Sequence, residues 1–214
     1  MTVFALQGDY LSELTYIVCE EGKALVIDPG TSGERVLAEC ERLSVEPIAV
    51  LLTHGHVDHA LGAAALQRAG VKVYAHKEEV SVINSKANLS VALGFSMETF
   101  APDVTVTDGE TLLLEPFSVK VIHTPGHTQG GVCYLMEDAL FTGDTLFSGS
   151  YGRTDFPTGD EQDLLCSIAN ELFELPAETK VYAGHGFASQ FAAPCEPQTT
   201  IAEEYSTNPI LNLL

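Results

Sequence analysis

Positive charge is scarce in this chain. Its 214 residues include 10 Lys and Arg against 30 Asp and Glu, which gives a formal net charge of −20. The basic residues are scattered and form no stripe. An acidic surface of this kind repels nucleic-acid phosphates and anionic membranes at long range. We therefore expect no nucleic-acid partner and no membrane partner.

Long apolar runs and paired cysteines are also missing. No segment approaches the ~20 apolar residues of a membrane-spanning helix. The opening MTVFALQGDYLSEL lacks the basic and apolar regions of a signal peptide. The five cysteines are an odd number and form no CxxC pair, which favours reduced thiols over a disulfide framework. These features predict a cytoplasmic protein, and they leave its oligomeric state open.

The chain has no low-complexity linker and no short-period repeat, so we expect a single domain over residues 1–214. Hydrophobic residues make up 45% of it, enough for a substantial core. Strand-like and helix-like patterns alternate in both halves, which predicts an α/β protein with sheets flanked by helices. Helices are expected at 32–44, 60–70 and 160–175. Hairpins are expected at 14–30 and 104–114, and further strands at 47–53, 71–76, 117–125, 131–136, 138–144 and 180–186.

Histidine and aspartate side chains follow the ends of several expected strands. This is where α/β sheets usually place ligand sites. The positions concerned are His54, His56, Asp58, His59, His127, Asp144 and His185.

Imidazole nitrogens and carboxylate oxygens are ligands that zinc prefers, and a catalytic zinc site keeps one position open for water. His54 and His56 are two residues apart, so in an extended loop both project to one side. Seven candidate ligands are enough for two ions. The alternative, a loop of ordinary histidines, does not account for the tight spacing of "THGHVDH".

The sequence resembles the metallo-β-lactamase superfamily. "THGHVDH" matches the HxHxDH signature of that family, and "HTPGHTQG", "FTGDTLF" and "YAGHG" match its later ligand motifs in the same order. "VIDPG", "GSYGRTDFPTGD" and "TNPIL" extend the likeness over almost the whole chain. The resemblance is nearest to the short hydroxyacylglutathione hydrolase (glyoxalase II) type. It implies a four-layer αββα sandwich of two mixed sheets with helices on the outer faces.

The resemblance also implies a role for each ligand. His54, His56 and His127 would bind a first metal, and Asp58, His59 and His185 a second. Asp144 would bridge the two ions, where a cysteine would have indicated a zinc lactamase. Zinc is the expected metal, with iron and manganese as alternatives. Asp58 would be the catalytic residue, orienting a metal-bridging hydroxide that attacks the substrate carbonyl.

The implied partner is a small-molecule thioester of the S-lactoylglutathione type. Relatives that bind glutathione firmly carry a C-terminal helical domain, and we expect no such glutathione-binding domain here. The substrate-binding residues are therefore not predicted. Residues 187–200 form a longer loop than in short relatives, which either covers the mouth of the site or is a surface insertion.

Two other functions are considered. Persulfide dioxygenases share the HxHxDH motif and "GRTDF", but bind one iron through two His and one Asp. The motif "YAGHG" favours a hydrolase over this alternative. A non-catalytic binding scaffold is disfavoured because all seven ligand positions are filled.

Four further residues are predicted to have structural roles. His123, four residues before His127, is expected to be a structural histidine. Arg153 and Asp155 are expected to form a buried or half-buried pair that braces the loop after Asp144. His76 is expected to start a helix and not to bind metal.

Overall fold

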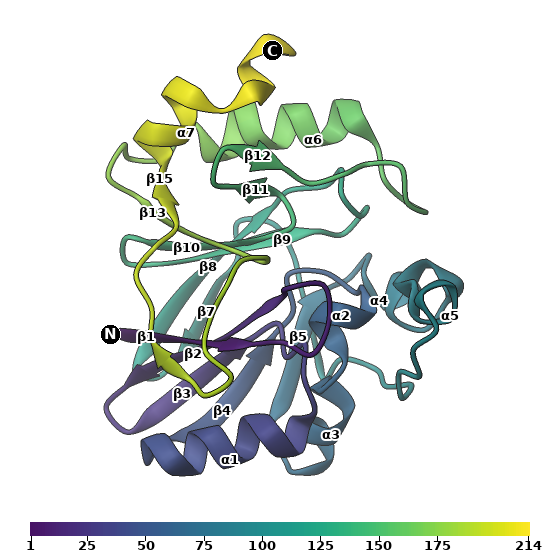
Figure 1. Ribbon diagram of the computed structural model, residues 1–214, viewed down its shortest axis with the longest axis vertical. Helices are drawn as coiled ribbons and strands as arrows, with labels where there is room; N and C mark the ends of the chain where they lie inside the picture. Colours follow the sequence, from purple (N-terminus) through teal and green to yellow (C-terminus); the bar gives the residue numbers. More distant parts are fainter.

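Two β-sheets lie face to face, with helices on their outer sides, in the computed structural model, which describes all 214 residues (Figure 1). Helices α1 and α3 cover one outer face, and α6 and α7 cover the opposite one. The predicted four-layer αββα sandwich is confirmed.

The first sheet contains seven strands in the order β14-β1-β2-β3-β4-β5-β6. Strands β3 to β6 run parallel, and β14, β1 and β2 make it mixed. Its strands are β1 (Thr2–Gln7), β2 (Leu14–Glu20), β3 (Lys23–Ile27), β4 (Glu46–Leu51), β5 (Lys72–His76), β6 (Val104–Val106) and β14 (Ala193–Pro194).

The second sheet contains six strands in the order β15-β13-β10-β9-β8-β7. Only β10 and β13 pair in parallel. Its strands are β7 (Thr111–Leu114), β8 (Phe117–His123), β9 (Val132–Met136), β10 (Ala139–Gly143), β13 (Lys180–Ala183) and β15 (Thr199–Thr200). A small separate ribbon joins β11 (Leu146–Phe147) to β12 (Ser150–Tyr151).

Apolar side chains from both inner faces form the central core. Tyr16 of the first sheet contacts Phe141 and Tyr182 of the second, with ring centroids 5.3 and 5.7 Å apart. The Tyr16 hydroxyl donates to the Ala183 carbonyl oxygen at 2.6 Å, so its polar atom is satisfied inside the core. The burial of these large rings is what holds the two halves together.

The helices pack through one apolar side each. In α1 (Gly33–Leu43) the side chain of Ser32 caps the first turn, and Val36 and Cys40 are buried against the first sheet. On the opposite face Leu164 and Ile168 pack against the second sheet. The remaining helices are α2 (Val57–Ala60), α3 (Ala63–Arg68), α4 (Val80–Ile83), α5 (Ser90–Leu93), α6 (Glu161–Ser167) and α7 (Ile201–Thr207). Short segments η1 (Lys86–Asn88), η2 (Ile168–Leu172) and η3 (Pro209–Asn212) complete the chain.

The expected hairpin at 104–114 is wrong. Strand β6 pairs with β5 in the first sheet, and β7 pairs with β8 in the second. The turn at Asp108 and Gly109 carries the chain from one sheet to the other. Asp108 accepts a hydrogen bond from the His123 backbone N–H at 2.9 Å, which ties this turn to the second sheet. Alternating apolar residues indicate strands, but they do not indicate which sheet each strand joins.

Residues 187–200 pass from the edge of the first sheet, at β14, to the edge of the second, at β15. β14 pairs with β1, and the Ala192 N–H donates to the buried carboxylate of Glu39 on α1 at 2.9 Å. Arg35 of the same helix donates to the Gln190 carbonyl oxygen at 2.6 Å. The segment is thus held against α1 and β1. No helix of the structure combines the length and apolarity needed to cross a bilayer.

Candidate metal centre

All seven predicted ligands meet at one edge of the sandwich. Four of them follow β4 of the first sheet, in the loop His54–Gly55–His56 and in α2. The other three follow strands of the second sheet: His127 after β8, Asp144 after β10 and His185 after β13. The site therefore lies across both halves of the molecule.

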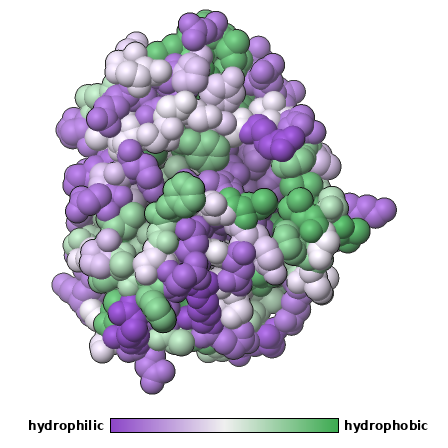
Figure 2. Space-filling view, viewed as in Figure 1, coloured by the Kyte–Doolittle hydropathy of each residue, from purple (hydrophilic) through white to green (hydrophobic).

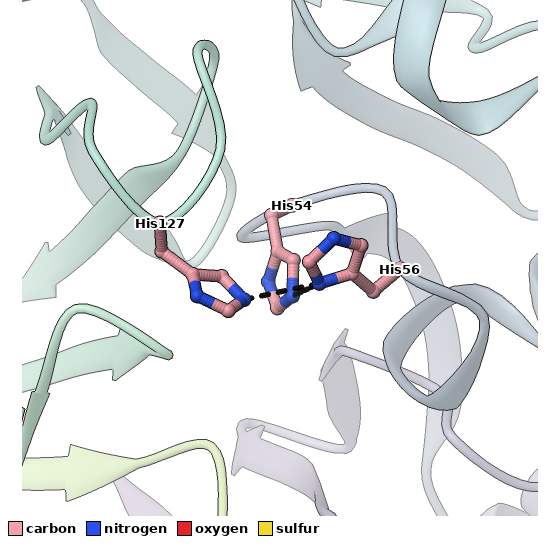
Figure 3. A group of neighbouring side chains, drawn as sticks. All are labelled: His54, His56 and His127. Atoms are coloured by element: carbon pink, nitrogen blue, oxygen red, sulfur yellow. Dashed lines mark hydrogen bonds between the residues drawn. The ribbon is translucent and has the colours of Figure 1, made fainter. Parts of the chain in front are cut away.

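Three histidines form the first group. His56 Nδ1 lies 3.0 Å from His54 Nε2 and 3.0 Å from His127 Nε2 (Figure 3). All three side chains are buried. Figure 3 shows His54 and His56 projecting from one loop and His127 reaching them from the other sheet.

A second group lies beside the first. His59 Nε2 and His185 Nε2 are 3.3 Å apart, and Asp58 Oδ2 lies 3.8 and 3.7 Å from them. The carboxylate of Asp144 contacts both groups, with Oδ1 3.3 Å from His59 Nε2 and Oδ2 3.5 Å from His127 Nε2. Asp144 is therefore in a position to join two ions.

The outer ring nitrogens have fixed acceptors. His127 Nδ1 lies 2.7 Å from the Arg153 carbonyl oxygen, and His185 Nδ1 lies 2.9 Å from that of Leu11. His59 Nδ1 lies 3.0 Å from Asp28 Oδ2. Each acceptor requires the Nδ1–H form of the ring, so Nε2 is left as a bare lone pair that faces the centre.

The protonated nitrogen of His54 is fixed in the same way, through Thr53. The Thr53 hydroxyl donates to Asp28 Oδ2 at 2.5 Å, so its oxygen accepts from His54 Nδ1 at 3.1 Å. The Nε2 atoms of His54 and His127 therefore carry no hydrogen, and in the first group only His56 Nδ1 can carry one toward them. Two bare lone pairs then face one point, and a cation is the partner that satisfies them. The site fits a metal ion on this ground.

Charges within the centre reinforce this conclusion. Burial and neighbouring imidazoles lower the pKa values of His54 and His56 well below the usual range, which keeps them neutral. Burial opposes ionisation of Asp144, but His59 and His185 outweigh it and hold the pKa of Asp144 well below its usual range. Burial also opposes protonation of His59 and His185, but the nearby carboxylates, Asp144 first, outweigh it and raise the pKa values of both rings. A metal ion would take the place of these protons, because imidazole binds metal in its neutral form and aspartate in its ionised form.

Asp28 is a functional residue that the sequence reasoning missed. Its two oxygens accept from the Thr53 backbone N–H, the Thr53 hydroxyl and His59 Nδ1. Both oxygens are occupied by these hydrogen bonds. Asp28 therefore orients His54 and His59 and is not itself a ligand in either group. Its place directly after the apolar strand β3, in "VIDPG", was the available signal.

Glu79 is a second residue that was missed. Its buried carboxylate accepts from the Gly55 N–H at 2.6 Å and from the Gly130 N–H at 2.9 Å. Gly55 separates His54 from His56, and Gly130 follows His127 by three residues. Glu79 thereby ties together the two loops that supply the first group. No local pattern in the sequence indicates this role.

His123 and His76 stack on each other away from the metal centre, with ring centroids 4.2 Å apart. His123 Nε2 lies 3.1 Å from the Gln129 carbonyl oxygen in the loop that carries His127. The expectation that His76 starts a helix is wrong. His76 is the last residue of β5, and α4 begins at Val80. The parallel pairing of β5 with β6 extends the strand through His76.

The Arg153–Asp155 pair is present but exposed, not buried or half-buried as predicted. Arg153 Nε and Nη2 each lie 2.6 Å from an Asp155 carboxylate oxygen, and the side chains are 57% and 67% exposed. The guanidinium also lies 4.0 Å from the Phe156 ring centroid. The backbone carbonyl of Arg153, through His127, is what braces the site.

The metal centre opens into a hollow of about 210 Å³. Leu11, Leu89, Leu93 and Phe156 line its walls, with Arg153 as the one Lys or Arg side chain. No residue of the 187–200 segment lines it, so that segment does not form a cover here.

The fold and the site together define a metallohydrolase with a His/Asp metal-binding cluster. The family model of the metallo-beta-lactamase superfamily matches residues 8–185, and the chain belongs to that superfamily. It is 36% identical over 199 residues to hydroxyacylglutathione hydrolase GloC from Haemophilus influenzae, covering 90% of this chain and 89% of GloC.

Three solved structures are similar throughout. BLEG-1, described as a B3 metallo-beta-lactamase, has 34% identity and a TM-score of 0.87, covering 97% of this chain and 98% of its own. TTHA1623 in a di-iron-bound form has 32% identity and a TM-score of 0.82 (96% and 98% covered). ETHE1 from Myxococcus xanthus has 31% identity and a TM-score of 0.76 (98% and 84% covered).

Proposed function

We propose that this protein hydrolyses thioesters with the help of two metal ions, acting as one domain over residues 1–214. The observation that carries the proposal is the arrangement of two groups of bare ligand atoms on either side of Asp144. His54, His56 and His127 would hold one ion, and Asp58, His59 and His185 the other. Zinc suits this donor set, and iron and manganese also bind His and carboxylate.

Two bound divalent ions would supply Lewis-acid stabilisation of the developing oxyanion and a water of lowered pKa. The chain contributes the positioning. Asp58 lines the hollow and has a carboxylate to orient the attacking water. Asp28 and the carbonyl oxygens of Arg153 and Leu11 fix the imidazoles before substrate arrives. A thiolate is a good leaving group, so the site needs no separate general acid.

The substrate class is a small-molecule thioester. Similarity to GloC over nine-tenths of the chain supports an S-2-hydroxyacylglutathione such as S-lactoylglutathione. We also propose a cytoplasmic location, supported by five unpaired cysteines.

A mononuclear iron persulfide dioxygenase is the second candidate, because ETHE1 from Myxococcus xanthus is 31% identical. The motif "YAGHG" around His185 supports the binuclear hydrolase instead. Similarity to a structure described as di-iron-bound adds to that support.

The deciding experiment is metal quantification on the purified protein followed by assays under nitrogen. We expect two metal ions per chain and oxygen-independent cleavage of S-lactoylglutathione. One iron per chain, with oxygen uptake on glutathione persulfide, would instead establish the dioxygenase. A chromogenic β-lactam belongs in the panel because BLEG-1 is described as a lactamase.

Two variants test the role of the cluster. Asp144→Ala should lose metal and about 10³-fold or more of the hydrolysis rate, since one carboxylate serves both groups. Asp138→Ala is the matched control, because Asp138 is half-exposed and pairs only with Lys180 at 2.9 Å. If Asp144→Ala kept its metal and its activity, the protein would be a binding scaffold and not an enzyme.

A further inference from the structure

The walls around the metal centre are apolar where a substrate must pass. Leu11 projects from the β1–β2 loop, Leu89 directly precedes the short helix α5, and Leu93 is its last residue. Phe156 stands beside the first group, with its ring centroid 5.9 Å from that of His56. Figure 2 shows hydrophobic residues gathered over the α5 region of this face.

The β1–β2 loop and the α5 segment are built as one wall. The rings of Tyr10 and Phe95 pack with centroids 3.9 Å apart and join the two segments. Leu11 and Leu89 both have positive φ, of 54° and 64°, a conformation that is unfavourable for leucine. Leu11 is 58% exposed and Leu93 is 38% exposed. Apolar surface is therefore left in contact with water beside the ligands, ready to contact a bound molecule.

The same walls offer no free positive charge. Arg153 is the one Lys or Arg side chain that lines the hollow, and the two N–H groups that it points at Asp155 already donate to that carboxylate. The chain as a whole carries a net charge of −20. Metal ions would attract an anion to the centre itself, but the walls hold no side-chain cation free to pair with the carboxylates of a peptide thiol such as glutathione.

We infer that the site selects thioesters by an apolar acyl chain and does not recognise the charged groups of the thiol. This inference rests on the proposed thioester hydrolysis and names its substrate class. The hollow of about 210 Å³ has room for an acyl chain of several carbons beside the metal centre.

The expected selectivity follows from burial of methylene groups. Full burial of one methylene favours binding by about fourfold, and the open mouth reduces this to about twofold. Four added methylenes, from acetyl to hexanoyl, should then raise kcat/KM by about tenfold or more. Exchange of glutathione for the uncharged thiol N-acetylcysteamine should change kcat/KM by less than about threefold, or raise it.

The test is a matrix of acetyl, butanoyl, hexanoyl and D-lactoyl thioesters, each made with glutathione and with N-acetylcysteamine. It uses the metal-loaded, full-length protein. Leu93→Ser should lower the hexanoyl-to-acetyl ratio of kcat/KM about fivefold with both thiols. Val91→Ser on the same helix is the matched control, since Val91 is 74% exposed and does not line the hollow. Arg153→Ala should affect both thiols equally.

The outcomes are separable. A preference for glutathione of more than tenfold at a fixed acyl group, or a loss confined to glutathione thioesters in Arg153→Ala, would overturn the inference and leave thioester hydrolysis intact. A flat dependence on acyl length would do the same. No cleavage of any thioester by protein with both metal ions bound would refute the proposed function, and the inference with it.

Discussion

Single residues decide which atoms of the centre are available to a metal. Asp28 accepts three hydrogen bonds and so sets the protonated nitrogen of His59 directly and that of His54 through Thr53. Such outer partners fix the orientation of a ligand as well as its tautomer. A conservative change at Asp28 should therefore act on metal binding without removing any ligand.

Asp28→Asn should weaken metal binding about 10- to 100-fold. The amide oxygen can still accept from the Thr53 N–H, but the amide nitrogen would face the Thr53 hydroxyl and His59 Nδ1–H as a third donor. Titration against a competing chelator measures the change. Asp103→Asn is the control, because Asp103 accepts from the Val73 N–H at 2.8 Å far from the ligands in sequence. Equal affinities in the two variants would contradict the role of Asp28.

His76 should make the fold sensitive to acid. Burial, assisted by the neighbouring His123, lowers the pKa of His76 from its usual value of 6.5 to about 4. The unfolded chain therefore binds more protons than the folded one between these values, and stability falls as the pH drops from 6.5 to 4. The loss from this residue is about 2–3 kcal/mol.

His76→Phe keeps a ring to stack on His123 and removes this titration. The free energy of unfolding, measured by denaturant at pH 7.5 and at pH 4.5, should therefore fall less in the variant than in the native protein. The contributions of other titrating groups to the fall in stability are the same in both proteins and cancel in the comparison. Identical falls in the two proteins would show that His76 does not contribute.

Among the structural elements, the site depends on hydrogen bonds that connect the loops following two different strands. The HxHxDH loop follows β4, and the loop of His127 follows β8 in the other sheet. Glu79, just before α4, connects them through Gly55 and Gly130. Both glycines are needed for this approach, because a Cβ at either position would lie 2.9 Å from a Glu79 carboxylate oxygen.

Glu79→Gln should weaken this connection because an amide offers one acceptor oxygen in place of two. One buried N–H would lose its partner, at a cost of about 1–3 kcal/mol in the free energy of unfolding. Metal affinity should fall together with stability. Glu39→Gln is the control: Glu39 is also buried and also accepts a backbone N–H, that of Ala192, but it lies on α1. It should lose stability and keep its metal affinity.

At the scale of the whole molecule, the metal centre joins the two sheets. Four ligands come from the first half of the sandwich and three from the second. A metal ion that binds only the folded state stabilises it by mass action. It also links two halves that otherwise meet through their apolar inner faces.

Metal removal should therefore destabilise the entire fold. Dialysis against a chelator should lower the free energy of unfolding by about 4 kcal/mol. The reference is protein in a free metal concentration one thousand times the Kd. Denaturant unfolding of both samples measures the difference. In Asp144→Ala the same treatment should have a smaller effect. An unchanged unfolding midpoint after complete metal removal would contradict the linkage.

Local patterns, together with the superfamily motifs, were enough to predict the class of fold, most strand ends and the seven candidate ligand positions. The apolar run before His54 indicates a buried strand. A metal site is indicated by the spacing of His54, His56, Asp58 and His59, which does not depend on the rest of the fold. The ordered motifs of the superfamily then placed His127, Asp144 and His185 in the same site.

Contacts between segments distant in the chain became known only from the folded structure. The fold separates β6 from β7 into different sheets, leaves Arg153 and Asp155 exposed, and brings Asp28 and Glu79 to the candidate ligands. It also places Leu11 and Leu93 in the wall of one hollow. The physical reason is that hydrogen bonds and burial depend on neighbours in space, and these contacts join residues tens of positions apart, such as the 51 that separate Glu79 from Gly130.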